Sequence, residues 1–347
     1  MTTRRELTLG LAGAGWMAGV HAYAAAQIPG LHIAKVASRS PERAQATAER
    51  IGAQAVPFSE VADGVNGVIV STPPAQHAAH ALAAVAAGAA VLVEKPLCTT
   101  LDDADALVDA AEDGATIAYA ENLLHAPVVR RALDHVGQLP GVDLLEVRAL
   151  QGRPDWGSFL TVEWGGGALF DLGAHPLAVA LALAAPARAV EVRASLEGAA
   201  DHPVDEHADV HLAFDTGLLA RLAVSWRQTG TPVWDAQVSS PDGVVRMELL
   251  PEVRLERNGV EVPLPPLPAG VAPQLEELGY LAQLEAFAVD VARGRHPAIG
   301  PVLGREVLDI TCAAYWSAGL GGAWVELPFE GPRDQPPISL WRSRRRP

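Results

Sequence analysis

Cysteine, basic residues and long apolar runs are all scarce in this chain, and each shortage excludes a class of protein. The 347 residues include only 2 cysteines, Cys98 and Cys312, which excludes a disulfide framework and indicates a reducing compartment. Lysine and arginine total 26 against 41 acidic residues, and the resulting charge of −15 argues against nucleic acid or an anionic membrane as a partner. The apolar stretch 78–90 is broken by His80 and Gly88, so we predict no membrane span. No apolar leader precedes the first expected strand, so we expect a cytoplasmic protein.

Hydrophobic residues make up 49% of the chain, which is enough core for two domains. The first expected domain, residues 1–121, alternates strand and helix with short connections, as in a doubly wound parallel sheet. Its strands are expected at Leu7–Ala12, His32–Ser38, Val56–Phe58, Gly67–Ser71, Ala90–Glu94 and Thr116–Ala120. Its helices are expected at Trp16–Gln27, Pro41–Ile51, Ala75–Ala87 and Leu101–Glu112.

The rhythm changes in the second expected domain, residues 122–347, where strands follow one another in series. These strands are expected at Leu144–Leu150, Ala189–Ser195, Ala208–Phe214, Leu218–Trp226, Trp234–Ser239, Gly243–Glu248, Val253–Arg257 and Ala323–Pro328. Helices are expected at Pro127–Val136, Phe170–Ala184, Leu275–Arg293 and Val302–Gly319. The pattern predicts a second, mainly antiparallel sheet. Few helices remain to cover one of its faces, so we expect subunits to associate there.

A glycine turn between the first strand and the first helix is the leading candidate for cofactor binding. Gly13 allows a tight turn, and Gly15 has no Cβ to block a pyrophosphate. Ala18 occupies the third position, which packs the helix against the strand. The helix beginning at Trp16 and Met17 would direct free N–H groups and its positive dipole end at the phosphates.

The end of the second strand bears on the choice between NAD and NADP. A carboxylate at this point would bind the ribose hydroxyls of NAD, but the sequence places Ser38 there, followed by Arg39 and Arg43. Serine hydroxyls and guanidinium groups suit the extra phosphate of NADP, so NADP is favoured. In the alternative, Arg39 is a solvated surface residue and NAD binds without an acidic anchor.

Two further strand ends should line the same crevice, because ligands bind at the carboxyl ends of parallel strands. The first of these ends carries Ser71, Thr72, Pro73 and, a few residues on, His77. A structural role for His77 is the alternative to cofactor contact. The second end carries Glu94 and Lys95, with Pro96 favouring an extended backbone at the lysine.

A glycine cluster in the second half leads into Asp171 and His175. The glycines Gly165, Gly166 and Gly167 permit close approach of a ligand or of backbone. Asp171 and His175 are four residues apart, so on one helix they would share a face. A carboxylate beside an imidazole is suited to proton transfer near neutral pH, although a capping aspartate and a structural histidine are equally compatible with the pattern.

Taken in order, Gly13-Ala14-Gly15 with Ala18, Glu94-Lys95-Pro96, and the glycine cluster with Asp171 and His175 resemble the Gfo/Idh/MocA oxidoreductase family. The resemblance extends over most of the chain. It implies a Rossmann domain, an α/β domain with a large open sheet, and a homodimer or homotetramer. It also implies NAD(P)-linked oxidation or reduction of a sugar, polyol or inositol, with Lys95, Asp171 and His175 as the catalytic set.

In that reaction a hydride passes between the substrate carbon and the nicotinamide while a proton leaves or joins the substrate oxygen. We expect His175 to be the acid/base, Lys95 to stabilise charge on the oxygen, and Asp171 to orient His175. Lys95 could carry the proton instead. Further substrate contacts are expected from Asn122, Arg153 and Trp156.

Three other functions remain open at the level of sequence. They are a glycoside hydrolase that retains NAD, a non-catalytic dinucleotide-sensing regulator, and a reductase of dihydrodiols or aldehydes. A metal centre is disfavoured, because the acidic and histidine residues at 201–209 fit no tetrahedral signature. We interpret that segment as a solvated loop leading into a strand.

Overall fold

The structure is a computed structural model that describes residues 6–155, 157–267 and 270–343. The chain forms two compact units. Unit 1 comprises residues up to Cys98, Asp102–Asn122 and Gly279–Arg305, and unit 2 comprises Thr99–Leu101, Leu123–Leu278 and residues from Glu306 onward. The segment 279–305, which lies late in the sequence, therefore belongs to the same unit as the N-terminal residues.

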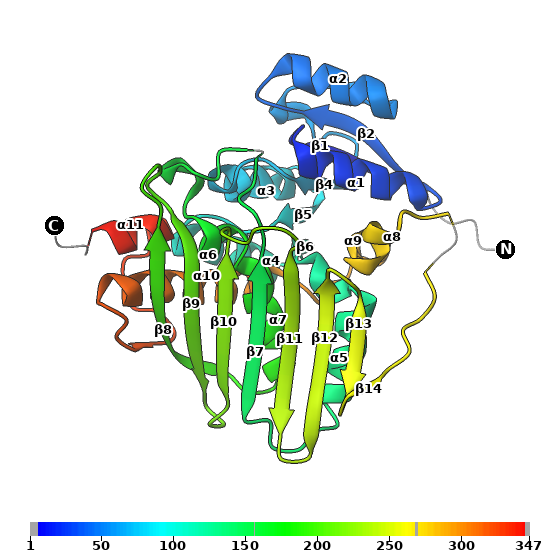
Figure 1. The fold of residues 1–347 in the computed structure, drawn as a ribbon. Helices are drawn as coiled ribbons and strands as arrows, with labels where there is room; N and C mark the ends of the chain where they lie inside the picture. Colours follow the sequence, from blue (N-terminus) through cyan, green and yellow to red (C-terminus); the bar gives the residue numbers. More distant parts are fainter. Residues whose placement is uncertain (1–5, 156, 268–269, 344–347) are drawn as a thin grey trace. The chain divides into compact units, whose positions relative to one another are not determined.

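Unit 1 is built on a parallel sheet of six strands, coloured from blue to cyan in Figure 1. The strands are β1 (Leu7–Ala12), β2 (Leu31–Ala37), β3 (Gln54–Ala55), β4 (Gly67–Val70), β5 (Ala90–Glu94) and β6 (Ile117–Ala120). Their order is β3-β2-β1-β4-β5-β6, and every neighbouring pair is parallel. The order reverses beside β1, and a doubly wound sheet binds its ligand at such a switch point.

Five helices of the described chain lie wholly or largely in unit 1, and capping residues mark the ends of at least one of them. They are α1 (Trp16–Gln27), α2 (Pro41–Ile51), α3 (His77–Ala86), α4 (Leu101–Glu112) and α9 (Tyr280–Arg293), with short 3-10 turns η1 (Phe58–Glu60) and η2 (Pro74–Gln76). Helix α2 is a clear case: the Ser40 side chain caps it, Pro41 occupies its first turn, and Gly52 ends it in a left-handed conformation. The strand expected at Val56–Phe58 is wrong, because pairing with β2 ends at Ala55 and Phe58 begins η1.

Unit 2 contains a nine-stranded sheet. The strands are β7 (Leu144–Leu150), β8 (Ala189–Gly198), β9 (Asp205–Phe214), β10 (Leu219–Ser225), β11 (Val233–Ser240), β12 (Gly243–Leu250), β13 (Arg254–Arg257), β14 (Val260–Glu261) and β15 (Val325–Glu326). Their order is β14-β13-β12-β11-β7-β10-β9-β8-β15, and only the β7–β10 pair is parallel. The predicted fold class, a doubly wound parallel sheet followed by a mainly antiparallel open sheet, is confirmed.

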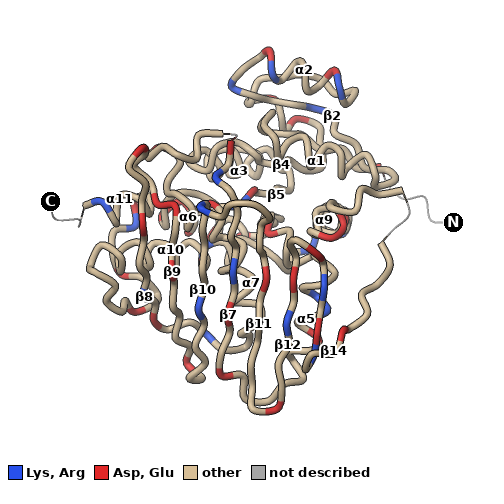
Figure 2. The backbone as a smooth tube through the Cα atoms, in the orientation of Figure 1, with Lys and Arg blue, Asp and Glu red and all other residues tan. Residues whose placement is uncertain are grey.

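One face of this sheet packs against helices. The helices and turns of unit 2 are η3 (Asn122–His125), α5 (Pro127–Val136), η4 (Val162–Trp164), α6 (Ala168–Asp171), α7 (Ala174–Ala184), α8 (Pro273–Glu277), α10 (Pro301–Gly319) and α11 (Pro337–Arg342), the first and α10 being shared with unit 1. Helices α5, α6 and α7 contact the sheet strands. Alternate strand residues on the other face are polar and solvent-facing, such as Arg148, Arg193, Asp209 and Arg221. Figure 2 shows charges of both signs along these strands.

Two predicted long helices are each broken in the structure. The helix expected at Phe170–Ala184 is divided into α6 and α7, and the segment Val162–Asp171, which contains α6, is bent by 45° relative to α7. The helix expected at Leu275–Arg293 is divided into α8 and α9 by Gly279, whose φ of 79° is left-handed. Asp171 ends α6 and His175 lies in the first turn of α7, so the assumption that one continuous helix carries both is wrong.

Among the described residues, no single helix is long and apolar enough to cross a membrane. The bent pair of 162–171 and 174–184 passes that test by length and composition only, and the residues of α7 are largely buried within unit 2.

Candidate active site

The glycine turn of unit 1 has the geometry that a bound pyrophosphate requires. Gly13 has a φ of 129°, and a Cβ there would lie 2.6 Å from both the carbonyl and hydroxyl oxygens of Ser71. A Cβ at Gly15 would meet nothing within 4 Å, so the space beside this residue is open. Gly15 precedes α1 and no side chain caps the helix there, which is the arrangement in which the N-terminus of a helix can bind a phosphate. Beside this turn Trp16 is 59% exposed, whereas Ala18 is fully buried.

The end of β2 carries the residues that bear on the ribose. The Ser38 hydroxyl accepts a hydrogen bond from the Ser40 N–H at 3.3 Å. The Ser40 hydroxyl accepts from the Arg43 N–H at 3.3 Å and donates to Glu42, which lowers the pKa of that carboxyl. Arg39 and Arg43 are exposed, and neither guanidinium has an ion-pair partner among the residues that the structure describes.

Glu94 and His77 are buried rather than turned outward. Glu94 Oε1 lies 2.7 Å from His21 Nε2, and its Oε2 accepts the Lys95 N–H at 3.0 Å. Burial raises the pKa of Glu94, but the hydrogen bond and charge of His21 outweigh burial and lower it. His77 is 1% exposed, with Nδ1 2.8 Å from the Pro96 carbonyl and Nε2 2.7 Å from the Thr72 carbonyl. His77 therefore contacts the backbone of the loops after β4 and β5, and Glu94 contacts the backbone of the loop after β5.

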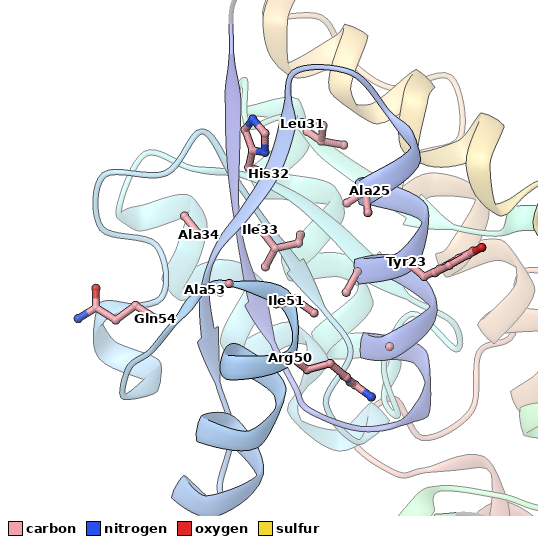
Figure 3. A pocket seen from close by; sticks show the side chains of 14 residues that line it. Tyr23, Ala25, Leu31, His32, Ile33, Ala34, Arg50, Ile51, Ala53 and Gln54 are labelled. Carbon is pink, nitrogen blue, oxygen red and sulfur yellow. The ribbon is translucent and has the colours of Figure 1, made fainter. Parts of the chain in front are cut away.

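A groove of about 1020 Å³ also lies on unit 1, lined by residues of α1, β2 and the end of α2 (Figure 3). Tyr23 and Arg50 stand at its sides, and alanines and glycines form much of its lining. Its lining includes neither the glycine turn nor Ser38 and Arg39, so this groove is not the predicted dinucleotide site.

In unit 2, the glycine cluster is required by packing against protein. A Cβ at Gly166 would lie 2.3 Å from the Phe170 Cβ, and one at Gly167 would lie 2.1 Å from the Asp205 carbonyl. Asp205 is fully buried at the start of β9. Its carboxylate accepts from the Gly167 N–H at 3.0 Å, from the Leu169 N–H at 2.8 Å, and from the Tyr315 hydroxyl. Asp205 thus acts as an N-terminal cap for α6, supplied from a distant part of the chain.

Asp171 and His175 both lie in the interior of unit 2, 8% and 4% exposed respectively. The His175 ring packs on Trp234, with ring centroids 5.6 Å apart and planes inclined by 39°. Trp234 faces the helices from β11, and the sequence analysis missed it because a tryptophan in an alternating strand gives no signal beyond core packing. Lys95 belongs to unit 1, and its place in one catalytic set with these two residues stays a prediction.

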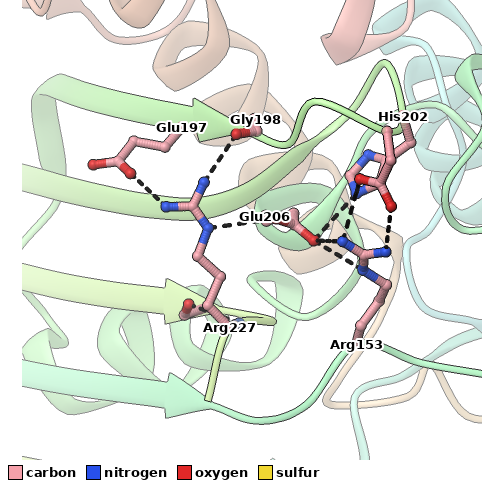
Figure 4. A network of polar contacts seen from close by, with 8 residues as sticks. Arg153, Glu197, Gly198, His202, Glu206 and Arg227 are labelled. Carbon is pink, nitrogen blue, oxygen red and sulfur yellow. Dashed lines mark hydrogen bonds and ion pairs between the residues drawn. The ribbon is translucent and has the colours of Figure 1, made fainter. Parts of the chain in front are cut away.

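Arg153 is engaged in an ion-pair network at one end of the sheet (Figure 4). Its guanidinium donates to Glu206 at 2.8 Å and to Asp201 at 2.9 Å, and Arg227 donates to the other Glu206 oxygen at 3.4 Å. Burial raises the pKa of Glu206, but the hydrogen bonds from Arg153 and His202 outweigh burial and lower it. The interpretation of this segment as a solvated loop is wrong for Asp205 and Glu206, which are buried in β9.

Two other predicted substrate contacts can be placed only in part. Asn122 is 3% exposed at the start of η3. Trp156 lies outside the described residues. Trp164, in the same loop, packs on Phe159 with ring centroids 4.5 Å apart, as expected of a packing anchor. Among the described residues, no group of three or more histidine, cysteine or acidic side chains could hold a metal ion.

A nicotinamide dinucleotide fits the residues of unit 1. The open space at Gly15, the uncapped N-terminus of α1 and the loops after β2, β4 and β5 converge on the switch point of the sheet. Gly13, Gly15, Trp16 and Met17 would hold the pyrophosphate, and Ser38 and Arg39 the adenosine ribose. The fold and this turn define a dinucleotide-binding protein of the Rossmann class.

Comparison with known families agrees with this class. A family model described as an oxidoreductase family with an NAD-binding Rossmann fold matches residues 7–121. A second model, for the GFO/IDH/MocA C-terminal domain, matches residues 132–246. The chain belongs to the Gfo/Idh/MocA family, and it is an NAD(P)-dependent oxidoreductase.

Similar proteins have related names. The chain is 28% identical over 330 residues to D-xylose 1-dehydrogenase (NADP(+)) 2 of Haloferax volcanii, covering 92% of this chain and 98% of that one. It is 30% identical over 256 residues to dTDP-3,4-didehydro-2,6-dideoxy-alpha-D-glucose 3-reductase of Saccharopolyspora spinosa, covering 67% and 74%. Among solved structures, GenD2 from gentamicin A biosynthesis, in complex with NAD, aligns with a TM-score of 0.84 at 27% identity, covering 94% and 98%.

Proposed function

We propose that the protein is an NADP-preferring dehydrogenase or reductase that acts on a hydroxyl or carbonyl carbon of a sugar or polyol. The observation that carries the proposal is the glycine turn, with Gly13 packed on Ser71 and open space at Gly15 beside an uncapped helix. Lys95 directly follows β5, a buried strand two places from β1 in the sheet, as expected for a residue at the crevice of such a sheet.

Two features at the end of β2 support the NADP preference. No carboxylate stands where one would bind the ribose of NAD, and the guanidinium groups of Arg39 and Arg43 are exposed. An arginine offers paired, charge-assisted hydrogen bonds to a phosphate. We expect Arg39→Ala to weaken NADP binding by about 10-fold or more, as loss of one charge-assisted contact would, while NAD binding changes little. Arg50→Ala, at the other end of α2, is the matched control, and calorimetric titration with each coenzyme measures the difference.

In the proposed reaction the nicotinamide, when bound, supplies or takes up the hydride. His175 takes the proton from the substrate hydroxyl or returns it, because an imidazole nitrogen can accept a proton and donate it again. Lys95 donates a hydrogen bond to the same oxygen and stabilises its developing negative charge. Asp171 orients His175. Arg153 has no place in this proposal, because its guanidinium already binds Glu206 and Asp201.

The sugar or polyol substrate class is supported by the names of the similar proteins, which are a xylose dehydrogenase and a nucleotide-sugar reductase. The test follows the absorbance of reduced nicotinamide with NADP and NAD in turn. The panel contains aldoses, inositols and sugar acids for oxidation, and keto-sugars for reduction. Turnover of one sugar class with preference for NADP supports the proposal. Binding of neither coenzyme would refute it.

We further propose a homodimer or homotetramer, formed through the uncovered face of the nine-stranded sheet. The face carries both signs of charge in neighbouring rows, for example the bidentate Arg148–Asp235 pair and the Arg254–Glu248 pair at 3.1 Å. Such a face can be complementary to a second copy of itself. Light scattering during size-exclusion chromatography measures the mass. Arg221→Glu, in the middle of the face, should shift the mass toward the monomer, whereas Arg50→Ala should not.

A further inference from the structure

The ring of His77 joins two loops that are far apart in sequence. It lies at the first residue of α3, where Nε2 is 2.7 Å from the Thr72 carbonyl after β4 and Nδ1 is 2.8 Å from the Pro96 carbonyl after β5. The ring is 1% exposed, so water does not compete for either contact. These two loops are the ones that we predict to line the dinucleotide-binding crevice.

Both partners of His77 are backbone carbonyls, which only accept hydrogen bonds. A neutral imidazole has one N–H and one lone pair. Either neutral tautomer would therefore turn a lone pair toward a carbonyl oxygen at hydrogen-bond distance, in a buried site where an unsatisfied polar group is costly. Only the doubly protonated ring donates at both nitrogens.

A buried carboxylate stands near this ring. Burial has the largest effect and leaves the pKa of His77 below its usual value, although the two carbonyls and the charge of Glu94 partly offset it. The contacts of both ring nitrogens with acceptors are what favour the doubly protonated ring. Of the other charged or titratable groups nearby, Lys95 follows Glu94, and His80 lies one turn along α3, stacked on Phe58 with ring centroids 4.2 Å apart. Burial, followed by the charge of His77, lowers the pKa of His80. The charge of Glu94 therefore acts on the ring of His77 without direct contact in the hydrogen-bond network, because its two oxygens are used by His21 and by the Lys95 N–H.

The backbone around Lys95 is fixed from two sides. Its N–H donates to Glu94 Oε2 at 3.0 Å, and the next carbonyl along the chain, that of Pro96, accepts from His77. His21 supports Glu94 from α1 but uses only Nε2, and its buried Nδ1 has no hydrogen-bond partner among the described residues. His21 thus differs from His77, both of whose ring nitrogens face acceptors.

We propose that His77 is a buried imidazolium that clamps the loop after β4 to the Lys95–Pro96 segment and so positions Lys95. His77 is then a positioning residue rather than a cofactor ligand, because both ring nitrogens are used by the protein. The inference rests on the proposed function only in giving Lys95 a role in the reaction. The protonation of the clamp is a property of the chain alone.

The first test needs no substrate. Histidine labelled with ¹⁵N in the ring gives signals whose shifts distinguish an imidazolium from each neutral tautomer, and His77→Gln identifies the His77 signals among those of the 11 histidines. We expect the imidazolium pattern near neutral pH in the wild-type protein, without coenzyme. A neutral tautomer under those conditions overturns the proposal, whatever reaction the protein catalyses.

The second test measures the effect on Lys95. The sequence contains only two lysines, Lys35 and Lys95, so ¹³Cε-labelled lysine gives one signal for each. Glutamine donates from a single nitrogen, whereas the two carbonyls are contacted from two different nitrogens of the ring, so glutamine can contact only one of them. His77→Gln should therefore shift the Lys95 signal and leave that of Lys35, whose Nζ donates to the Glu60 carbonyl at 2.9 Å, unchanged. An unshifted Lys95 signal in a folded His77→Gln protein would overturn the positioning role.

The third test uses kinetics. We expect His77→Gln to lower kcat by about 10- to 100-fold through misplacement of Lys95, with little change in the Kd of the coenzyme. The wild type should lose kcat on the alkaline side as His77 deprotonates, and the variant should lack that limb. His80→Gln, one turn away, is the matched control and should behave as the wild type. Equal kcat and equal pH profiles for the two variants would contradict the positioning role, whereas absence of turnover in the wild type would count against the proposed function alone.

Discussion

Replacing Asp205 by asparagine should destabilise unit 2 strongly, although the change removes no more than a charge and one acceptor. The carboxylate is fully buried and satisfies three donors: Gly167 N–H and Tyr315 hydroxyl at Oδ1, and Leu169 N–H at Oδ2. An asparagine oxygen at the Oδ1 position could keep the first two. Its NH₂ group would then face the Leu169 N–H, donor against donor.

The magnitude follows from these contacts. One hydrogen bond to a charged acceptor is lost, and one buried N–H is left unsatisfied, so we expect Asp205→Asn to cost about 2–4 kcal/mol in the free energy of unfolding. Asp205→Ala removes the acceptor of the Leu169 N–H and of the Tyr315 hydroxyl, whereas the Gly167 N–H keeps the Tyr315 oxygen at 3.0 Å, so this variant should cost about 3–6 kcal/mol by the same reasoning. Because Gly167 and Leu169 begin the short helix that ends at Asp171, turnover should fall as well.

Tryptophan fluorescence during urea unfolding measures this loss well, because the chain has 8 tryptophans and only Trp16 falls in the residue ranges of unit 1. Asp209→Asn, on the exposed face of the same strand, is the control and should change stability by about 0.5 kcal/mol or less. Hydrogen exchange at the Gly167 and Leu169 amides should accelerate only in the Asp205 variants. If Asp205→Asn matched Asp209→Asn in unfolding free energy, the buried cap would not stabilise the fold and the reasoning would fail.

Three further predictions concern the proposed chemistry and the pH response. Lys95→Ala and His175→Ala should each lower turnover by about 10²-fold or more while coenzyme titrations stay near wild type, and near-normal steady-state rates would remove that residue from the mechanism. Gly15→Ala should melt at the wild-type temperature but lose coenzyme affinity, whereas Gly13→Ala should lose both, because its added Cβ has no room and its φ is 129°. Burial lowers the pKa of His125 to about 4, so its contribution to stability should be present above pH 6.5 and be lost as the pH falls below it. As the pH falls from 6.5 to about 4, the midpoint of urea unfolding should fall less steeply for His125→Asn than for the wild type. Parallel plots of midpoint against pH for the two proteins would contradict this prediction.

The dinucleotide site could be predicted from the sequence because its signals are local. Gly13 needs a positive φ, Gly15 needs an absent side chain, and the helix that follows begins at a fixed spacing, so a dozen neighbouring residues contain the information. Most strands could be predicted for the same reason, because apolar runs and the turn residues between them are also local signals. The short β3 escaped prediction because a two-residue pairing leaves almost no pattern.

Contacts between distant residues could not be predicted in the same way. The bend between α6 and α7, where a regular helix was expected, places Asp171 and His175 on two different helices. The burial of Asp205 depends on donors at Gly167, Leu169 and Tyr315, which lie up to 110 residues away. The sequence around Asp205, rich in histidine and acidic residues, predicts a solvated aspartate. Its burial follows only from the tertiary structure.

The sequence by itself thus determined the class of fold and the glycine turn, because both follow from spacing along the chain, and its resemblance to a family made Lys95, Asp171 and His175 candidates. Only the tertiary structure decided that His77 faces two carbonyls, that Glu94 is buried against His21, and that residues 279–305 complete the first unit. The physical reason is that burial and hydrogen-bond partnership are properties of neighbours in space. A buried polar side chain takes its role from the groups that satisfy it, and those groups come together only when the chain folds.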